Sequence, residues 1–231
     1  MLGWVIPPPT RPRKLPEEFR RERAQKVEEL TRVGYLTSLR VRQALLTVRR
    51  EEFIPRPYRD YAYQEVPLPL PGERATISCP HSYPLFYEPL GLECGDRFLE
   101  VGLGSGYGAA VAREVVGPEG LVVSVEIDPV TFAFAKQNLE RSGYHDVVLV
   151  NADGGLGHPP AQPYDKIAVT AACRVIPDPL IAQLAPGGRV IAPILAGPTQ
   201  QLVLGEKRPD GLRCWDICSV LYVSLRGKFG A

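Results

Sequence analysis

Short apolar runs alternate with helical stretches through the second half of the chain. The runs are rich in Val, Ile and Leu, which is typical of buried strands. The expected strands are 97–101, 121–126, 146–150, 166–170 and 189–194, and the expected helices are 106–116, 129–142 and 177–184. The alternation predicts an α/β fold: a doubly wound, mostly parallel, Rossmann-like sheet with helices on both faces.

The C-terminal part of the chain has a different pattern. The segments QQLVLGEKR and LRCWDICSVLYVSL lie on either side of Pro209-Asp210-Gly211, which is a turn signal. Two strands joined by a tight turn pair antiparallel. We therefore expect an antiparallel C-terminal hairpin that closes one edge of the sheet.

The N-terminal third divides into a leader and a covering region. Residues 1–16 are rich in proline and arginine, so they predict a mobile or surface-wrapping leader rather than a helix. Residues 17–81 contain two helical patterns and a long proline-rich and aromatic-rich loop, and we expect them to cover an active site. Residues 82–231 form the main domain of this division.

Composition and charge exclude several classes of protein. The 231 residues include 27 Lys and Arg against 26 Asp and Glu, and no basic stripe is evident outside the leader. Neither a nucleic acid nor a membrane partner is therefore indicated. Five cysteines without a CxxC pair indicate no disulfide framework, and we expect no metal site. No signal peptide or long apolar run is present, so a soluble cytoplasmic protein is expected.

The segment FLEVGLGSGY, residues 98–107, carries the strongest functional signal. Glycines at Gly102, Gly104 and Gly106 allow a tight turn and close approach of a ligand to the backbone. Gly104 and Gly106 together with Ala109 also give a weak match to a dinucleotide-binding pattern. A nucleotide-type cofactor is the leading hypothesis.

Acidic residues at successive strand ends narrow the choice of cofactor. Glu100 ends the first strand, where a carboxylate can meet the ammonium group of S-adenosylmethionine, a group that NAD lacks. Glu126, which ends the second strand, is suited to accept hydrogen bonds from ribose hydroxyls. Asp153 and Gly154 follow the third strand, beside the expected adenine position. The alternative is that these carboxylates only terminate strands and cap helices.

Further motifs carry a family resemblance. The segments FLEVGLGSGY, VVSVEID, NADGG, YDKIAVTAAC and IPDPLIAQLAPGGRVIAPI resemble the successive motifs of class I S-adenosylmethionine-dependent methyltransferases. The segments VRREEFIP, AYQEVPLPL, RATISCPH and LYVSLRGKFG are similar to those of the protein-L-isoaspartate O-methyltransferase family. The resemblance extends from about Val41 to the C-terminus.

The resemblance implies S-adenosyl-L-methionine as cofactor and the free α-carboxylate of isoaspartyl residues in damaged proteins or peptides as methyl acceptor. The sequence does not disclose the oligomeric state, and a monomer is favoured. The roles that the resemblance implies are catalytic for Ser78 and Thr76, cofactor-binding for Glu100, Gly102, Gly104, Gly106, Glu126, Ile127, Asp153, Gly154 and His81, and substrate-binding for Ile77, Thr170, Ala171 and Ala172. Alternatives remain open: Ser78 as a helix N-cap, His81 as a surface or core residue, and residues 170–172 as simple packing.

The chain departs from the family pattern on the acceptor side. Ser82, Pro84 and Pro89 are poor residues for a helix interior, so we expect the cover over the cofactor to be reshaped. Arg74 and Ser224 also replace a neutral residue and a proline that are common in the family. Two alternatives follow: a relative that methylates another carboxylate, or a protein that binds S-adenosylmethionine without turnover.

Overall fold

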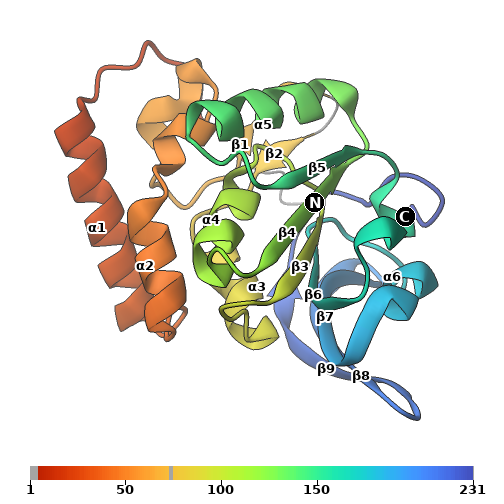
Figure 1. The fold of residues 1–231 in the computed structure, drawn as a ribbon. Helices are drawn as coiled ribbons and strands as arrows, with labels where there is room; N and C mark the ends of the chain where they lie inside the picture. Colours follow the sequence, from red (N-terminus) through yellow and green to blue (C-terminus); the bar gives the residue numbers. More distant parts are fainter. Residues whose placement is uncertain (1–4, 73–74, 231) are drawn as a thin grey trace.

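The computed structural model describes residues 5–72 and 75–230. A seven-stranded sheet with the order β5-β4-β3-β6-β7-β8-β9 forms its centre (Figure 1). The strands are β3 (Arg97–Val101), β4 (Leu121–Glu126), β5 (Val148–Asn151), β6 (Tyr164–Val169), β7 (Leu184–Ala196), β8 (Thr199–Arg208) and β9 (Gly211–Val220). Strands β3 to β7 pair in parallel. The predicted Rossmann-like sheet is confirmed.

Consecutive side chains of the central strands point to opposite faces of the sheet. In β3, Phe98 belongs to one apolar cluster and Leu99 to the other; in β4, Val122 and Val123 divide in the same way. All four side chains are fully buried. The apolar runs seen in the sequence are therefore strands with a hydrophobic layer on each side.

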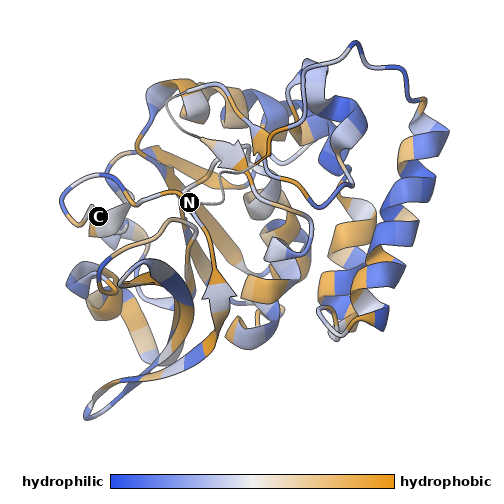
Figure 2. Cartoon of the chain, turned by 180° about the vertical axis from the view of Figure 1, so that it is seen from behind, coloured by the Kyte–Doolittle hydropathy of each residue, from blue (hydrophilic) through white to orange (hydrophobic). Residues whose placement is uncertain are grey.

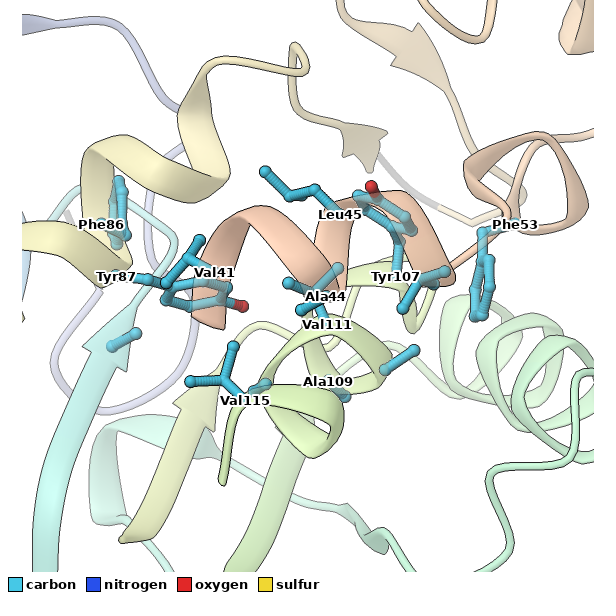
Figure 3. Packing of buried hydrophobic residues seen from close by; sticks show 14 of the residues in the cluster. Val41, Ala44, Leu45, Phe53, Phe86, Tyr87, Tyr107, Ala109, Val111 and Val115 are labelled. Carbon is cyan, nitrogen blue, oxygen red and sulfur yellow. The ribbon is translucent and has the colours of Figure 1, made fainter. Parts of the chain in front are cut away.

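The helices α4 (Tyr107–Val116) and α5 (Pro129–Arg141) follow β3 and β4, and the short α6 (Asp178–Gln183) precedes β7. Outside the sheet, α2 (Leu39–Thr47) and α3 (Ser82–Leu90) pack on the same cluster as α4 (Figure 3). This second layer of helices brings the N-terminal region onto the main domain.

The helix α3 contains the prolines expected to disturb it. Pro84 falls in the first turn, where backbone N–H groups need no partner within the helix, and Pro89 is the last residue but one. Gly91 then ends the helix in the left-handed conformation, with φ of 61°. The segment therefore forms a helix because its prolines lie near the two ends.

The leader wraps over the surface. Thr10 N donates to Pro57 O at 2.8 Å and Arg13 N to Asp60 Oδ2 at 2.9 Å, which fixes it against the 3₁₀ helix η2 (Arg56–Tyr61). It leads into α1 (Pro16–Arg32), whose outer surface is mostly hydrophilic (Figure 2). Residues 1–4 of the predicted leader lie outside the described residues.

The antiparallel edge is larger than the predicted hairpin. The strands β8 and β9 do pair across Pro209-Asp210, but β8 also pairs antiparallel with β7 from Arg189 to Ala196. The C-terminal edge is therefore a three-stranded meander rather than a separate hairpin. Within residues 5–72 and 75–230, no helix is both long and apolar enough to cross a membrane.

Candidate active site

A cavity of about 990 Å³ lies at the carboxyl ends of β3, β4 and β6. Ligands bind at this edge in doubly wound folds. The predicted site residues that line the cavity are Thr76, Ile77, Ser78, His81, Glu100, Gly102, Gly104, Glu126, Ile127, Gly154, Thr170 and Ala171. Gly106, Asp153 and Ala172 do not line it. Segments that are up to about a hundred residues apart in sequence therefore form one site.

The glycine loop between β3 and α4 forms part of the cavity wall. Gly102, Gly104 and Gly106 have φ angles of 101°, 55° and 85°, which side-chain-bearing residues rarely adopt. A Cβ at Gly102 would lie 2.3 Å from Thr170 Oγ1. Gly106 instead packs against Leu139 on α5, so its role is to bring the loop close to that helix.

Glu100 is a buried carboxyl that faces the cavity. It is 3 % exposed and accepts a hydrogen bond of 2.6 Å from Ser124 Oγ. Burial raises its pKa to about 8, although the Ser124 hydroxyl opposes the shift. A Cβ at Gly108 would lie 2.1 Å from Glu100 Oε1, so the glycine leaves room for this carboxyl. The site thus holds an acidic group whose charge a cationic ligand would stabilise.

Glu126 ends β4 beside the glycine loop. Its two carboxylate oxygens accept hydrogen bonds from Gly104 N at 3.1 Å and Asp128 N at 3.0 Å. Burial raises its pKa, and the backbone donors oppose this. Each oxygen has a further lone pair, which suits it to accept from vicinal hydroxyls. Ile127 lines the cavity next to it.

The motif suggested that Asp153 lies beside the adenine position, but its side chain does not line the cavity. Its carboxylate accepts from Gly155 N at 2.9 Å and from Lys228 N at 2.7 Å. The side chain therefore fixes the C-terminal segment, while Gly154 lines the cavity. A Cβ at Gly154 would lie 2.6 Å from Val101 Cγ1, so this glycine allows close packing on β3.

The acceptor segment is a short strand, β2 (Thr76–Ile77), paired with β1 (Leu68–Pro69), and then Ser78. Ser78 lines the cavity and does not cap α3, because that helix begins four residues later. The Ser78 carbonyl accepts a hydrogen bond of 2.6 Å from Arg50 Nη2. The N-cap alternative for Ser78 is therefore wrong.

Arg50 is a buried cation that holds this segment. It is 1 % exposed, and its Nε donates to Ala62 O at 2.6 Å. Its guanidinium lies 5.6 Å and 5.2 Å from the ring centres of Tyr83 and Tyr107, within the range of cation–π attraction. Arg50 thus links the acceptor segment, the preceding loop and the first residue of α4.

His81 lies at the cavity wall in a polar chain. His81 Nδ1 is 2.7 Å from Glu65 Oε2, and Glu65 Oε1 is 3.3 Å from Lys26 Nζ. Cys79 is also close, so that Glu65, Cys79 and His81 could offer a metal three ligand atoms within 4.8 Å of one another. The Glu65 carboxylate, however, is already shared between His81 and Lys26, so a metal would have to displace both.

Thr170 and the two following alanines connect the sheet to the cavity. The Thr170 hydroxyl lies 3.0 Å from Val101 O and 2.9 Å from Gly102 O, so it donates to the glycine loop. Ala171 lines the cavity, whereas Ala172 is fully buried and its N–H donates to Val223 O at 2.7 Å. Thr170 and Ala172 therefore hold other segments in place.

Sequence reasoning on individual residues missed the wall of the cavity that residues 218–226 form. This wall includes Tyr222 and Arg226, and Arg226 forms an ion pair of 3.3 Å with Asp128. Tyr35 and Tyr83 also line the cavity. The only signal was the LYVSL segment, which resembles the family without indicating a role. Arg74, named as a departure from the family pattern, lies outside the described residues.

Comparison with known proteins agrees with this geometry. Residues 21–230 match the family Protein-L-isoaspartate(D-aspartate) O-methyltransferase (PCMT). The chain belongs to this family. It is 46% identical over 193 residues to protein-L-isoaspartate O-methyltransferase 1 of Archaeoglobus fulgidus, covering 84% of this chain and 88% of that one. It is 44% identical over 223 residues to the Hyperthermus butylicus enzyme, covering 93% and 92%.

Solved structures give the same fold. A protein-L-isoaspartate O-methyltransferase superposes with a TM-score of 0.84 at 37% identity, covering 90% of this chain and 67% of that one. A Plasmodium falciparum protein described as a putative member, in complex with S-adenosyl-L-homocysteine, has a TM-score of 0.78 at 24% identity, covering 87% and 97%. The chain is an S-adenosylmethionine-dependent carboxyl methyltransferase of the PCMT family.

Proposed function

We propose that this enzyme esterifies the free α-carboxylate of L-isoaspartyl residues in damaged proteins or peptides, and that the cavity divides into two halves. Glu100, Gly102, Gly104, Glu126, Ile127 and Gly154 line the cofactor half. The acceptor half comprises Thr76, Ile77, Ser78, Thr170 and Ala171. The cover of residues 17–81 supplies Ser78, and the main domain supplies the cofactor half.

The residues present fit the cofactor. A buried carboxyl faces the cavity at Glu100, and the Cβ position of Gly104, which lines the same cavity, is open, since its nearest neighbour is Leu70 Cδ1 at 3.8 Å. Glu126 keeps acceptor capacity for two ribose hydroxyls. When bound, S-adenosylmethionine supplies a methyl group on a positively charged sulfur. The carboxyl of Glu100, in its ionised form, matches the ammonium group of the same molecule.

The acceptor needs no general base. An α-carboxylate has a pKa of about 3.5, so it is already ionised and nucleophilic at neutral pH. The protein then has to hold that carboxylate in line with the methyl group and exclude water. The observation that carries the proposal is that Ser78, whose carbonyl Arg50 fixes, lines the same cavity as Glu100. Its hydroxyl can donate to the acceptor oxygen.

The variant Ser78→Ala tests the acceptor role. We expect methyl transfer to an isoaspartyl peptide to fall by about 10- to 100-fold in kcat, since one hydrogen bond to a charged group is lost, with S-adenosylhomocysteine affinity changed less than about twofold. The aspartyl form of the peptide is the control substrate. Equal turnover in variant and wild type would remove Ser78 from the mechanism, and transfer to neither peptide would overturn the isoaspartyl substrate.

We also propose a monomer in the cytoplasm as the working form. The strand-end residues of the cofactor half and Ser78 of the acceptor half come from this chain and already line one cavity. The five cysteines are all free, as expected in a reducing compartment. Light scattering at micromolar concentration tests whether the protein is a monomer, and a stable dimer would contradict this proposal.

A further inference from the structure

A second cavity, of about 370 Å³, lies between the leader, α1 and the 3₁₀ helices η1 (Arg50–Phe53) and η2. In Figure 1 these are the red and orange segments that precede β1. Its charged lining residues are Lys14, Arg20, Arg23, Arg49, Arg56, Arg59, Glu51 and Glu52. Six cations therefore face two carboxylates, in a chain whose formal net charge is only +1. The sequence shows no basic stripe outside the leader, and these cations gather only in the fold.

Carboxylates neutralise part of this charge: Glu22 pairs with Lys14 and Glu17 with Arg20, while Glu51 and Glu52 lie near Arg23 and Arg59. Glu51, which is 4 % exposed, accepts a hydrogen bond of 2.6 Å from Tyr63 OH. Glu52 lies 3.5 Å from Arg59 and 3.8 Å from Arg141. Within the described part of the chain, Arg49 and Arg56 form no ion pair.

Two arginine donors beside the cavity lack a hydrogen-bond partner. Arg23 Nη1 and Arg59 Nε are inaccessible to solvent and have no hydrogen-bond partner among the described residues. The side chain of Arg23 is 11% exposed, and its Nη1 approaches Glu51 Oε1 only to 3.7 Å, which is too long for a hydrogen bond. Because solvent does not reach these two atoms, a ligand in the cavity would instead contact the exposed guanidinium groups, such as those of Arg49 and Arg56.

We propose that this cavity binds a polyphosphate group, as pyrophosphate, tripolyphosphate or the phosphate chain of a nucleotide. Five of the six cations are arginines, whose planar guanidinium groups bind phosphate oxygens in pairs. The cations come from four separate segments and surround a space within the size range of ligand sites. A chain of phosphates can reach several of them at once, whereas a single phosphate cannot.

Titration calorimetry of the full-length protein with tripolyphosphate tests the proposal. We expect a micromolar Kd in dilute salt that weakens as salt rises, because surface charges are screened. The double variant Arg49→Glu, Arg56→Glu should bind at least tenfold more weakly. Both side chains are exposed and unpaired in the described part of the chain, so their reversal leaves the fold intact. Unchanged affinity for S-adenosylhomocysteine confirms this.

The matched control is Arg40→Glu, Arg42→Glu, which makes the same change of charge at two exposed arginines of the same region that do not line the cavity. This control should keep wild-type affinity for tripolyphosphate. An equal loss in both double variants would show general attraction and overturn the site. No binding at millimolar tripolyphosphate would also overturn it.

Two further probes sharpen the assignment. Citrate carries several carboxylates but no phosphate, and we expect it to bind at least tenfold more weakly than tripolyphosphate. Equal affinity for citrate would overturn the phosphate assignment. ATP that binds more tightly than tripolyphosphate would identify a nucleotide as the source, while equal affinity would show that the phosphate chain alone is recognised.

Discussion

The proposed cofactor half and the proposed acceptor half of the active-site cavity are constructed differently. The cofactor half consists of the ends of adjacent strands, and its glycine loop and carboxylates follow directly from β3 and β4. The acceptor half brings together β2, Ser78 and the end of β6, and residues 218–226 form a further wall of the cavity. Those segments are held by Arg50, by the pairing of Ala172 with Val223 and by Asp128 with Arg226. The first half depends on local backbone geometry, and the second depends on long-range contacts.

The variant Gly102→Ala should have the largest effect on the cofactor half. Its φ of 101° disfavours a side chain, and the new Cβ would meet the Thr170 hydroxyl at 2.3 Å. We expect S-adenosylhomocysteine affinity to fall at least about 100-fold, because the loop must shift by the order of an ångström. Titration calorimetry with S-adenosylhomocysteine measures this affinity.

The control for that variant is Gly143→Ala. Gly143 has a similar φ of 87° but open space around its Cβ position. It should lose only about 1–2 kcal/mol of stability through backbone strain and keep its cofactor affinity. If both variants bind the cofactor equally well, the glycine loop is not the cofactor wall.

The variant Arg50→Met tests the acceptor half. It removes the donor to Ser78 O and Ala62 O and leaves both carbonyls without a partner, so stability should fall by about 3 kcal/mol. We expect kcat for an isoaspartyl peptide to fall about 30-fold, with a smaller loss of cofactor affinity. Steady-state kinetics and calorimetry separate these effects.

Two companion variants keep this test specific. Arg50→Lys retains a cation and should recover part of kcat, whereas Arg49→Met changes an exposed neighbour and should have wild-type kinetics. A parallel loss of kcat and cofactor affinity in Arg50→Met would show that Arg50 supports the whole cavity through Tyr107 rather than the acceptor segment.

Cofactor binding should depend on pH through Glu100. In the free protein its pKa is about 8, since it is buried, so the carboxyl is mostly protonated at pH 7. An ammonium ligand favours the ionised form and lowers that pKa. Binding should therefore release a proton, and affinity should rise between pH 6 and pH 8 by up to about tenfold per pH unit. Calorimetry in two buffers of different ionisation enthalpy measures the number of protons released on binding.

The same group gives a stability test. The folded state holds the Glu100 proton more tightly than the unfolded chain, whose carboxyl has a pKa near 4.5. The stabilisation is complete below 4.5 and is lost as pH rises to about 8. Thermal unfolding of the free protein should show this loss, and Glu100→Gln should lack both this loss and the pH-dependent affinity. A wild-type affinity that stays constant from pH 6 to 8 would contradict the proposed contact.

The variant Thr170→Val should give the smallest effect. It removes the hydroxyl shared by Val101 O and Gly102 O but keeps the shape of the side chain. We expect a loss of about 1 kcal/mol in stability and about threefold in cofactor affinity. A threefold rise in peptide KM with no change in cofactor affinity would instead show that the Thr170 hydroxyl acts on the acceptor and not through the glycine loop.

The amino-acid sequence by itself determined the parallel sheet, the glycine loop and the strand-end carboxylates. These features depend on alternation, apolar runs and glycine positions within a few residues, which local rules describe. The strands around Gly102 and Glu126 therefore appear where their pattern predicted them. The position of α3 was less evident, because the effect of a proline depends on the turn in which it falls.

Only the tertiary structure decided which residues meet. Asp153 binds the C-terminal segment and Ala172 pairs with residue 223. The sequence could not predict these contacts, because the partners are more than fifty residues away and no local pattern encodes the pairing. Nothing in the sequence distinguished Arg50 from the other arginines, and only the fold buries it and lets it donate to the Ser78 carbonyl. The basic cavity arose in the same way: charges that balance along the chain were separated in space when the leader folded over η2.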